Sequence, residues 1–155
     1  MKIPLIFIFG LMNLIVFAQT EEELQVKKTI VEFFDAFHAQ DSIAIKQTVY
    51  PTILLQTIGV DKEGKPILKT ENFDDLVKSI TSIPDSTNFQ ERIMSYSIQI
   101  DGNMANAWTP YQFWINSEFH HCGVNSFQLF REENTWKIIY LIDTRRKSDC
   151  SVLSE

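Results

Sequence analysis

The stretch FHHCGVNSFQLFREENTWKIIYLIDTR, residues 119–145, decides the fold. It holds two long runs rich in aromatic and β-branched residues, 119–131 and 136–145, separated by the polar residues 132–135. Two such runs around a short polar tip are typical of a β-hairpin. We therefore expect two long antiparallel strands here.

The pairing of this hairpin predicts which side chains face inward. If Arg131 lies opposite Trp136, cross-strand partners share a face, and the face that holds Trp136 is apolar enough to be the concave, core side. Asn125 and His121 then point toward the mouth of a cavity, with Tyr140 deeper. The outer face carries His120, Cys122, Phe130, Ile139, Leu141, Asp143 and Arg145, and a slip of one residue would exchange the two faces.

Further strands are expected before the hairpin. Residues 91–100 alternate as a strand, and Asp101-Gly102-Asn103 reads as a tight turn. Residues 104–116 form another long strand, in which Pro110 implies an edge position or a bulge because proline cannot donate to the ladder.

The first half of the chain is mainly helical. Thr20 and Glu23 form a capping box before an apolar stripe of helical period, and Asp41 and Asn72 can cap two further helices. The predicted helices are 21–39, 42–49 and 73–80, with short strands at 52–57 and 67–70. Helices followed by a meander of strands predict an α+β fold with helices on one face of the sheet.

The chain resembles the nuclear transport factor 2-like superfamily, which includes SnoaL-like and ketosteroid isomerase-like proteins. The resemblance covers about residues 22–147 and rests on FDAFHAQD at 34–41, GVNSFQLF at 123–130 and TWKII at 135–139. It implies a cone or cystatin-like roll, in which three N-terminal helices pack on a strongly curved antiparallel sheet around a cavity. Members include enzymes, binding proteins and interaction modules, so the fold does not fix the function.

Residues 1–18 predict a bacterial secretory signal peptide. Lys2 precedes an apolar run over residues 3–17, and acidic residues rather than basic ones follow it. The alternative is an uncleaved anchor, although the run is shorter than the about 20 apolar residues that a span needs. We expect a periplasmic or secreted protein without membrane association, with a domain at 19–147 and a tail at 148–155.

The net charge limits the kinds of partner to expect, and the cysteine content bears on disulfide formation. The formal net charge is −6 and no basic run occurs, which argues against nucleic acid as a partner. Cys122 and Cys150 are a candidate disulfide in an oxidising compartment. The alternative is one buried thiol and one thiol on the tail, and a bridge requires the chain after Arg146 to fold back.

The candidate site residues gather around the predicted cavity. His121 could act as an acid or base near neutral pH, or it could be an ordinary hydrogen-bonded histidine. Neighbouring strand residues point to opposite faces, so we expect only one of His120 and His121 to enter the cavity. No metal-ligand spacing, phosphate-binding loop or buried acid pair is evident, so no metal or cofactor is expected. The predicted ligand-binding residues are Tyr111, Phe113, His121, Asn125, Tyr140 and His38.

Three functions are compatible with this pattern. The favoured one is binding of a small apolar or amphipathic molecule in the cone cavity. A second is a homodimeric interaction module with a filled core, which associates through Phe130, Ile139 and Leu141 on the outer face. A third is an isomerase- or dehydratase-like enzyme that uses His121, but no complete catalytic constellation is readable, which favours a protein that is not an enzyme.

Overall fold

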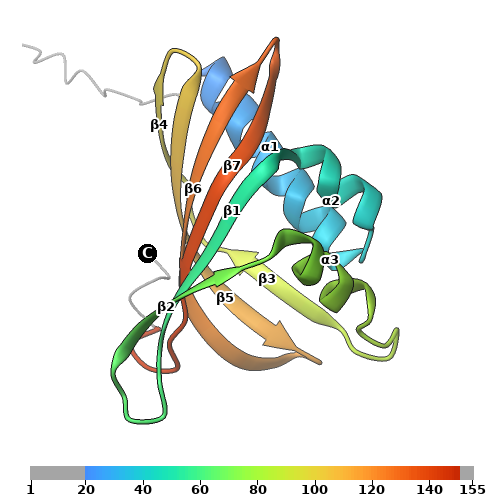
Figure 1. The fold of residues 1–155 in the computed structure, drawn as a ribbon, viewed down its shortest axis with the longest axis vertical. Helices are drawn as coiled ribbons and strands as arrows, with labels where there is room; N and C mark the ends of the chain where they lie inside the picture. Colours follow the sequence, from blue (N-terminus) through green and yellow to red (C-terminus); the bar gives the residue numbers. More distant parts are fainter. Residues whose placement is uncertain (1–19, 151–155) are drawn as a thin grey trace, which may run out of the picture.

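The computed structural model describes residues 20–150, so the predicted signal peptide lies outside the described residues. Three helices and seven strands follow one another in the expected order (Figure 1). The helices are α1 (Glu21–His38), α2 (Ser42–Thr48) and α3 (Phe73–Thr81). The strands are β1 (Val49–Val60), β2 (Pro66–Glu71), β3 (Phe89–Ile93), β4 (Ser97–Asp101), β5 (Met104–Ile115), β6 (Glu118–Glu132) and β7 (Thr135–Thr144). The fold is α+β, as the sequence predicts.

Each helix begins at a side chain that accepts backbone N–H groups. Thr20 and Glu23 form the predicted capping box at the start of α1. Asp41 accepts from the first turn of α2, and Asn72 accepts from that of α3. These caps fix where the helices start. The apolar faces of the helices then pack on the sheet.

The sheet is mixed rather than purely antiparallel. Its strand order is β2-β1-β7-β6-β5-β3, with β4 also paired to β5. The prediction of a purely antiparallel sheet is wrong for one pair of strands, because β1 and β7 run parallel. Figure 1 shows the sheet bending around the helices, which all lie on one side of it.

The predicted strand 91–100 is two strands, β3 and β4, which pair with successive parts of β5. The break lies beside Pro110, whose carbonyl accepts from the Met94 N–H at 2.8 Å. Because proline has no N–H to return, the ladder is interrupted there. The expected edge position or bulge at Pro110 is therefore wrong: β5 is an interior strand, its ladder with β6 is regular at Pro110, and the interruption falls in the strand on its other side.

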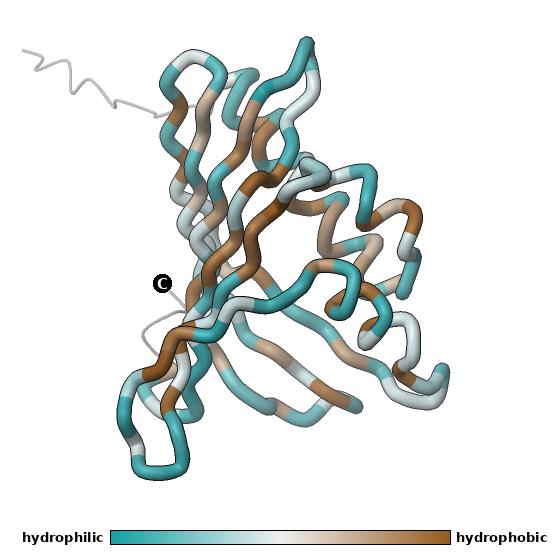
Figure 2. The backbone as a smooth tube through the Cα atoms, in the orientation of Figure 1, coloured by the Kyte–Doolittle hydropathy of each residue, from teal (hydrophilic) through white to brown (hydrophobic). Residues whose placement is uncertain are grey.

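The core lies between α1 and the concave side of β5, β6 and β7. Val26, Ile30, Phe127, Leu129 and Ile138 are completely buried in it. Figure 2 shows apolar residues along the strands and on the helices, and polar residues at the hairpin tips. This core occupies one part of the cone and leaves another part open.

Two β-bulges shift the predicted pairing. In the β6–β7 ladder, Leu129 pairs with Ile138 as expected, but Gln128 pairs with Tyr140, which leaves Ile139 as an extra residue. From this point on, each residue of β7 lies on the face opposite to the predicted one. Leu141 lines the cavity, although we expected it on the outer face, and Tyr140 leaves the cavity face.

The second bulge lies between β5 and β6. Phe113 pairs with His121 and Trp114 pairs with Phe119, so His120 is the extra residue. The expected alternation of the two histidines is therefore wrong, because the bulge turns both side chains toward the cavity.

The chain folds back after β7. Arg146 exchanges two backbone hydrogen bonds with Cys122, and a disulfide joins Cys122 to Cys150. Cys122, expected on the outer face, is completely buried beneath this returning segment. Across residues 20–150, the helices are all too short or too polar to span a membrane.

Candidate functional site

A cavity of about 290 Å³ opens between the helices and the concave side of the sheet. Its apolar wall comes from both layers and consists of Phe33, Phe34, Phe37, Leu55, Leu76, Ile80, Phe113 and Leu141. The volume is close to the lower end of the range for small-molecule sites, about 300 Å³. The expected alternative of a filled core is wrong, because the side chains leave this space open.

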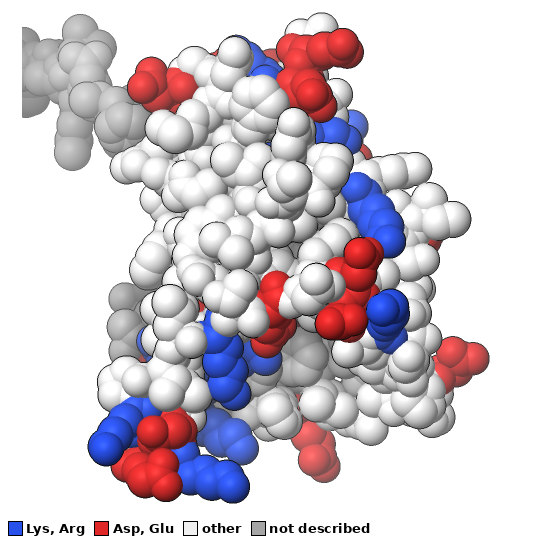
Figure 3. Space-filling view, in the orientation of Figure 1, with Lys and Arg blue, Asp and Glu red and all other residues white. Residues whose placement is uncertain are grey.

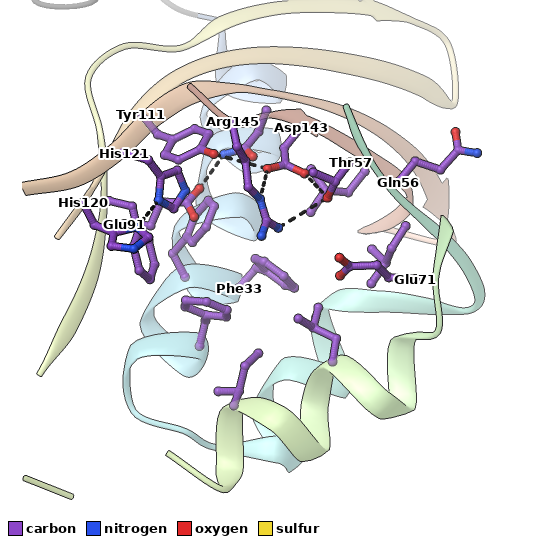
Figure 4. A pocket seen from close by; sticks show the side chains of 18 residues that line it. Phe33, Gln56, Thr57, Glu71, Glu91, Tyr111, His120, His121, Asp143 and Arg145 are labelled. Carbon is purple, nitrogen blue, oxygen red and sulfur yellow. Dashed lines mark hydrogen bonds and ion pairs between the residues drawn. The ribbon is translucent and has the colours of Figure 1, made fainter. Parts of the chain in front are cut away.

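The polar end of the cavity is organised by Asp143 on β7. The Thr57 hydroxyl donates to its Oδ1 at 2.5 Å, and the Tyr111 hydroxyl donates to its Oδ2 at 3.2 Å. Arg145 adds an ion pair from Nε to Oδ2 at 2.8 Å. Figure 4 shows this network on the sheet side, with Phe33 facing it from the helix side. Asp143 is thus a buried carboxylate whose charge is matched by Arg145.

Glu91 on β3 is the second carboxyl group at this end. Asn125 donates from Nδ2 to its Oε1 at 2.6 Å, whereas Oε2 has no hydrogen-bond partner among the described residues. Burial raises the pKa of Glu91 to about 7; the Asn125 hydrogen bond opposes the shift and the charge of Asp143 adds to it. Glu91 can therefore hold or release a proton near neutral pH.

A histidine pair forms another part of the wall. The Nδ1 atoms of His120 and His121 are 2.7 Å apart, so one ring must donate to the other. The His121 ring also stacks on Phe113, with centroids 4.9 Å apart. Burial, followed by the positive charge of Arg145, lowers the pKa of His121 to about 4. His121 is therefore a neutral acceptor or donor at neutral pH.

Gly123 makes room for the Tyr111 side chain. A Cβ atom at Gly123 would lie 2.8 Å from the Tyr111 ring and 1.7 Å from the carbonyl oxygen of Thr144. That same carbonyl accepts the Tyr111 hydroxyl at 3.0 Å. The close approach of these three residues requires glycine here and holds the phenol against Asp143.

Four of the six predicted ligand-binding residues line the cavity, namely Tyr111, Phe113, His121 and Asn125. The other two do not. Tyr140 points away because of the bulge at Ile139, and its hydroxyl donates to Gln56 at 2.6 Å. His38 accepts the backbone N–H of Glu91 through Nε2 at 2.9 Å, so it supports β3 from behind the cavity wall.

The sequence did not reveal Glu91, Asp143 and Arg145 as a group, although the structure brings all three to the polar end of the cavity. A signal for Glu91 was present, since it shares a strand face with Phe89 and Ile93. Acidic side chains are rarely buried unless they are paired, so a lone acid on an apolar face marks a candidate site residue. Asp143 and Arg145 were expected on the outer face, and this prediction is wrong, because nothing in the sequence marks the bulge at Ile139. In the part of the chain that the structure describes, no group of three acidic, histidine or cysteine side chains is arranged to hold a metal.

Comparison with solved structures identifies the fold. A protein of unknown function with an NTF2-like fold from Shewanella baltica OS155 is 18% identical, with a TM-score of 0.59, and the match covers 84% of this chain and 100% of that one. A cystatin-like protein of unknown function from Nostoc punctiforme is 13% identical, with a TM-score of 0.64 over 83% and 95% of the two chains. An NTF2-like protein of unknown function from Pseudomonas putida KT2440 is 10% identical, with a TM-score of 0.65 over 84% and 91%.

These similarities show that the chain has the NTF2-like, cystatin-like fold. No protein-family model and no curated protein matches the sequence. The fold is compatible with many functions, so the cavity is the feature of this chain that bears on its function.

Proposed function

We propose that this protein binds a small amphipathic molecule in the cone cavity, as an exported domain outside the cytosol. The observation that carries this proposal is the division of the cavity into an aromatic and aliphatic wall and one polar end. An apolar pocket with a few convergent polar groups is the usual form of a small-molecule site. The apolar body of the ligand would lie against Phe33 and Leu141, and its polar group would reach Glu91.

The rigidity of the polar end favours binding. Asp143 is held by three neighbours, Tyr111 is fixed over Gly123, and Asn125 fixes Glu91. Groups that are already positioned need not be ordered when the ligand arrives, which improves affinity. Because burial of an apolar body supplies most of the binding free energy, the polar groups would chiefly set orientation and specificity.

A second candidate function is acid–base catalysis on the bound molecule. It is favoured by the pKa of Glu91, about 7, in a cavity that is also lined by His121, which is neutral at that pH. The sequence suggests His121 for the acid–base role, whereas in this candidate function Glu91 takes that role. It needs a substrate whose reacting atom lies within hydrogen-bond reach of Oε2.

Homodimer formation remains a separate proposal. The outer sheet face exposes Leu54, Met104, Trp108 and Phe130, although Leu141 is not part of it. Figure 3 shows few charged groups on the face over β1, β6 and β7, whereas charges gather on the β1–β2 hairpin. An uncharged face with large apolar side chains supports association with a second copy.

The binding proposal is tested by closing the cavity. Calorimetric titration with 2-phenylethanol should give saturable binding to the wild type and none to Leu141→Trp, whose indole would fill the space. Leu54→Trp is the matched control, because Leu54 lies on the outer face of the neighbouring strand. Equal binding by all three proteins would place the probe outside the cavity and reject the proposal.

A further inference from the structure

We infer that the cavity selects an amphipathic amine, a molecule with one ammonium group on a compact apolar or aromatic body. This inference rests on the proposed binding function and adds the chemical class of the ligand. Three features of the polar end support it: its free acceptors, its charge balance and the aromatic rings beside it.

Hydrogen-bond acceptors without partners predominate at the polar end. Oε2 of Glu91, Oδ1 of Asn125 and both carboxylate oxygens of Glu71 lack donors among the described residues. Of the donors there, the Tyr111 hydroxyl is used on Asp143 and the Thr144 carbonyl, and Arg145 gives two of its five N–H groups to Asp143 and Thr57. An ammonium group has three donors and no acceptor, so it matches what this end leaves unfilled.

The charges at the polar end also favour a cation. Three carboxyl groups, those of Glu71, Glu91 and Asp143, line the cavity with one arginine and no lysine. Arg145 is ion-paired with Asp143 and acts on the other two carboxyl groups only from a distance, so among the described residues Glu71 and Glu91 have no ion pair of their own. Figure 4 shows Glu71 and Glu91 on opposite sides of Arg145, both directed toward the cavity. A ligand carboxylate would meet these two acids in a partly desolvated space, where like charges repel strongly, whereas an ammonium would pair with them.

The aromatic wall would stabilise the same charge. Phe33, Phe34, Phe37 and Phe113 all line the cavity. A cation near the face of such a ring is attracted by its quadrupole, and the rings also accept an apolar body. A cationic head on an aromatic body therefore uses both parts of the cavity.

The pH dependence of amine binding follows from the surroundings of Glu91. The groups that face it are Asp143 and Arg145 from β7, Tyr111 from β5, Asn125 and His121 from β6, and His38 from α1. Of these, only Arg145 is positive at neutral pH, and it is already paired with Asp143. An ammonium should therefore bind more tightly as Glu91 ionises, whereas a neutral analogue should not.

The test compares three probes of one shape: 2-phenylethylammonium, 2-phenylethanol and phenylacetate. Calorimetry near pH 8 should give the ammonium at least about tenfold tighter binding than the alcohol, with phenylacetate the weakest. Between about pH 6 and pH 8 the ammonium affinity should rise while that of the alcohol stays constant. Glu91→Gln and Glu71→Gln should each reduce the preference for the ammonium, and Glu63→Gln, on the distant β1–β2 hairpin, should not.

The outcomes separate this inference from the proposed function. Equal binding of alcohol and ammonium, tighter binding of phenylacetate, or an unchanged preference in both Glu91→Gln and Glu71→Gln would overturn the amine inference and leave small-molecule binding intact. Failure of all three probes to bind would reject the binding function, and the amine inference with it.

Discussion

Asn125 on β6 donates a 2.6 Å hydrogen bond to Glu91 on β3, across the intervening strand β5. This contact fixes a carboxyl group that burial would otherwise make costly, and it leaves the second carboxyl oxygen directed into the cavity. The proposed function depends on this arrangement, since it makes Glu91 both positioned and titratable.

Glu91→Gln should change stability in a pH-dependent way. The pKa of Glu91 rises from 4.5 to about 7 on folding, so the folded protein retains a proton that the unfolded chain has lost, and stability falls as pH rises through this window. At about pH 8 the amide variant should be more stable than the wild type by up to about 3 kcal/mol, and near pH 4.5 the two should be alike. Urea unfolding at both pH values measures this difference, and a difference that is the same at both would contradict it.

Gly123→Ala should destabilise the protein and displace Tyr111. The added methyl group would lie 1.7 Å from the Thr144 carbonyl oxygen, so the backbone of β6 or β7 must move. We expect a loss of at least about 1–3 kcal/mol in unfolding free energy. Gly59→Ala is the control, because beyond its chain neighbours no atom lies within 4 Å of the position that its new methyl group would take, and its change in stability should be small. Equal losses in the two variants would disprove the steric argument.

Removal of the disulfide should weaken the fold at the cavity edge. The bridge joins residues separated by 28 positions and holds the chain that follows Arg145 against β6. The double variant Cys122→Ala/Cys150→Ala should lose about 3–4 kcal/mol. Reductant should lower the urea midpoint of the wild type and have no effect on the double variant. A wild type that is insensitive to reductant under unfolding conditions would speak against the bridge.

His121 should remain uncharged well below the usual range for histidine. Burial and the neighbouring Arg145 lower its pKa to about 4, so folding loses stability as pH falls from about 6.5 toward that value. A histidine NMR titration should show the His121 ring changing charge near pH 4. Arg145→Gln removes one cause and should raise this pKa. A His121 midpoint near 6.5 in the wild type would refute the described environment.

Trp108→Glu should test the proposed homodimer. Trp108 is 54% exposed on the outer sheet face, and a charge there would oppose burial against a second copy. Sedimentation should give a dimer for the wild type and a monomer for the variant, with Lys62→Glu on the β1–β2 hairpin as a control that stays dimeric. A wild type that is monomeric at high concentration would exclude the dimer.

Sequence patterns predicted the fold more fully than the site. The capping box at Thr20 and the turn at Gly102 depend on local residues, and both helix and hairpin appear where these predict them. The faces of β5 and β6 follow from alternation, so Tyr111 and Asn125 were expected in the cavity wall. These features are local, which is why one sequence suffices to predict them.

The rest of the site depends on bulges, which carry no clear local signal. One extra residue at Ile139 brings Asp143, Arg145 and Leu141 into the cavity and removes Tyr140. Another at His120 places both histidines in the wall. The parallel pairing of β1 with β7 joins segments far apart in sequence, and it is what brings Thr57 to Asp143.

The most direct measurement of the binding site is a methyl NMR titration of the wild type with 2-phenylethylammonium. Leu55, Leu76 and Leu141 line the cavity, whereas Leu54 and Leu68 are exposed on other surfaces. If the cone cavity binds the probe, the methyl signals of the first three residues shift and saturate together, and those of the last two stay in place. Shifts at Leu54 and Leu68 alone, or no saturable shift at any of the five, would contradict small-molecule binding in the cavity.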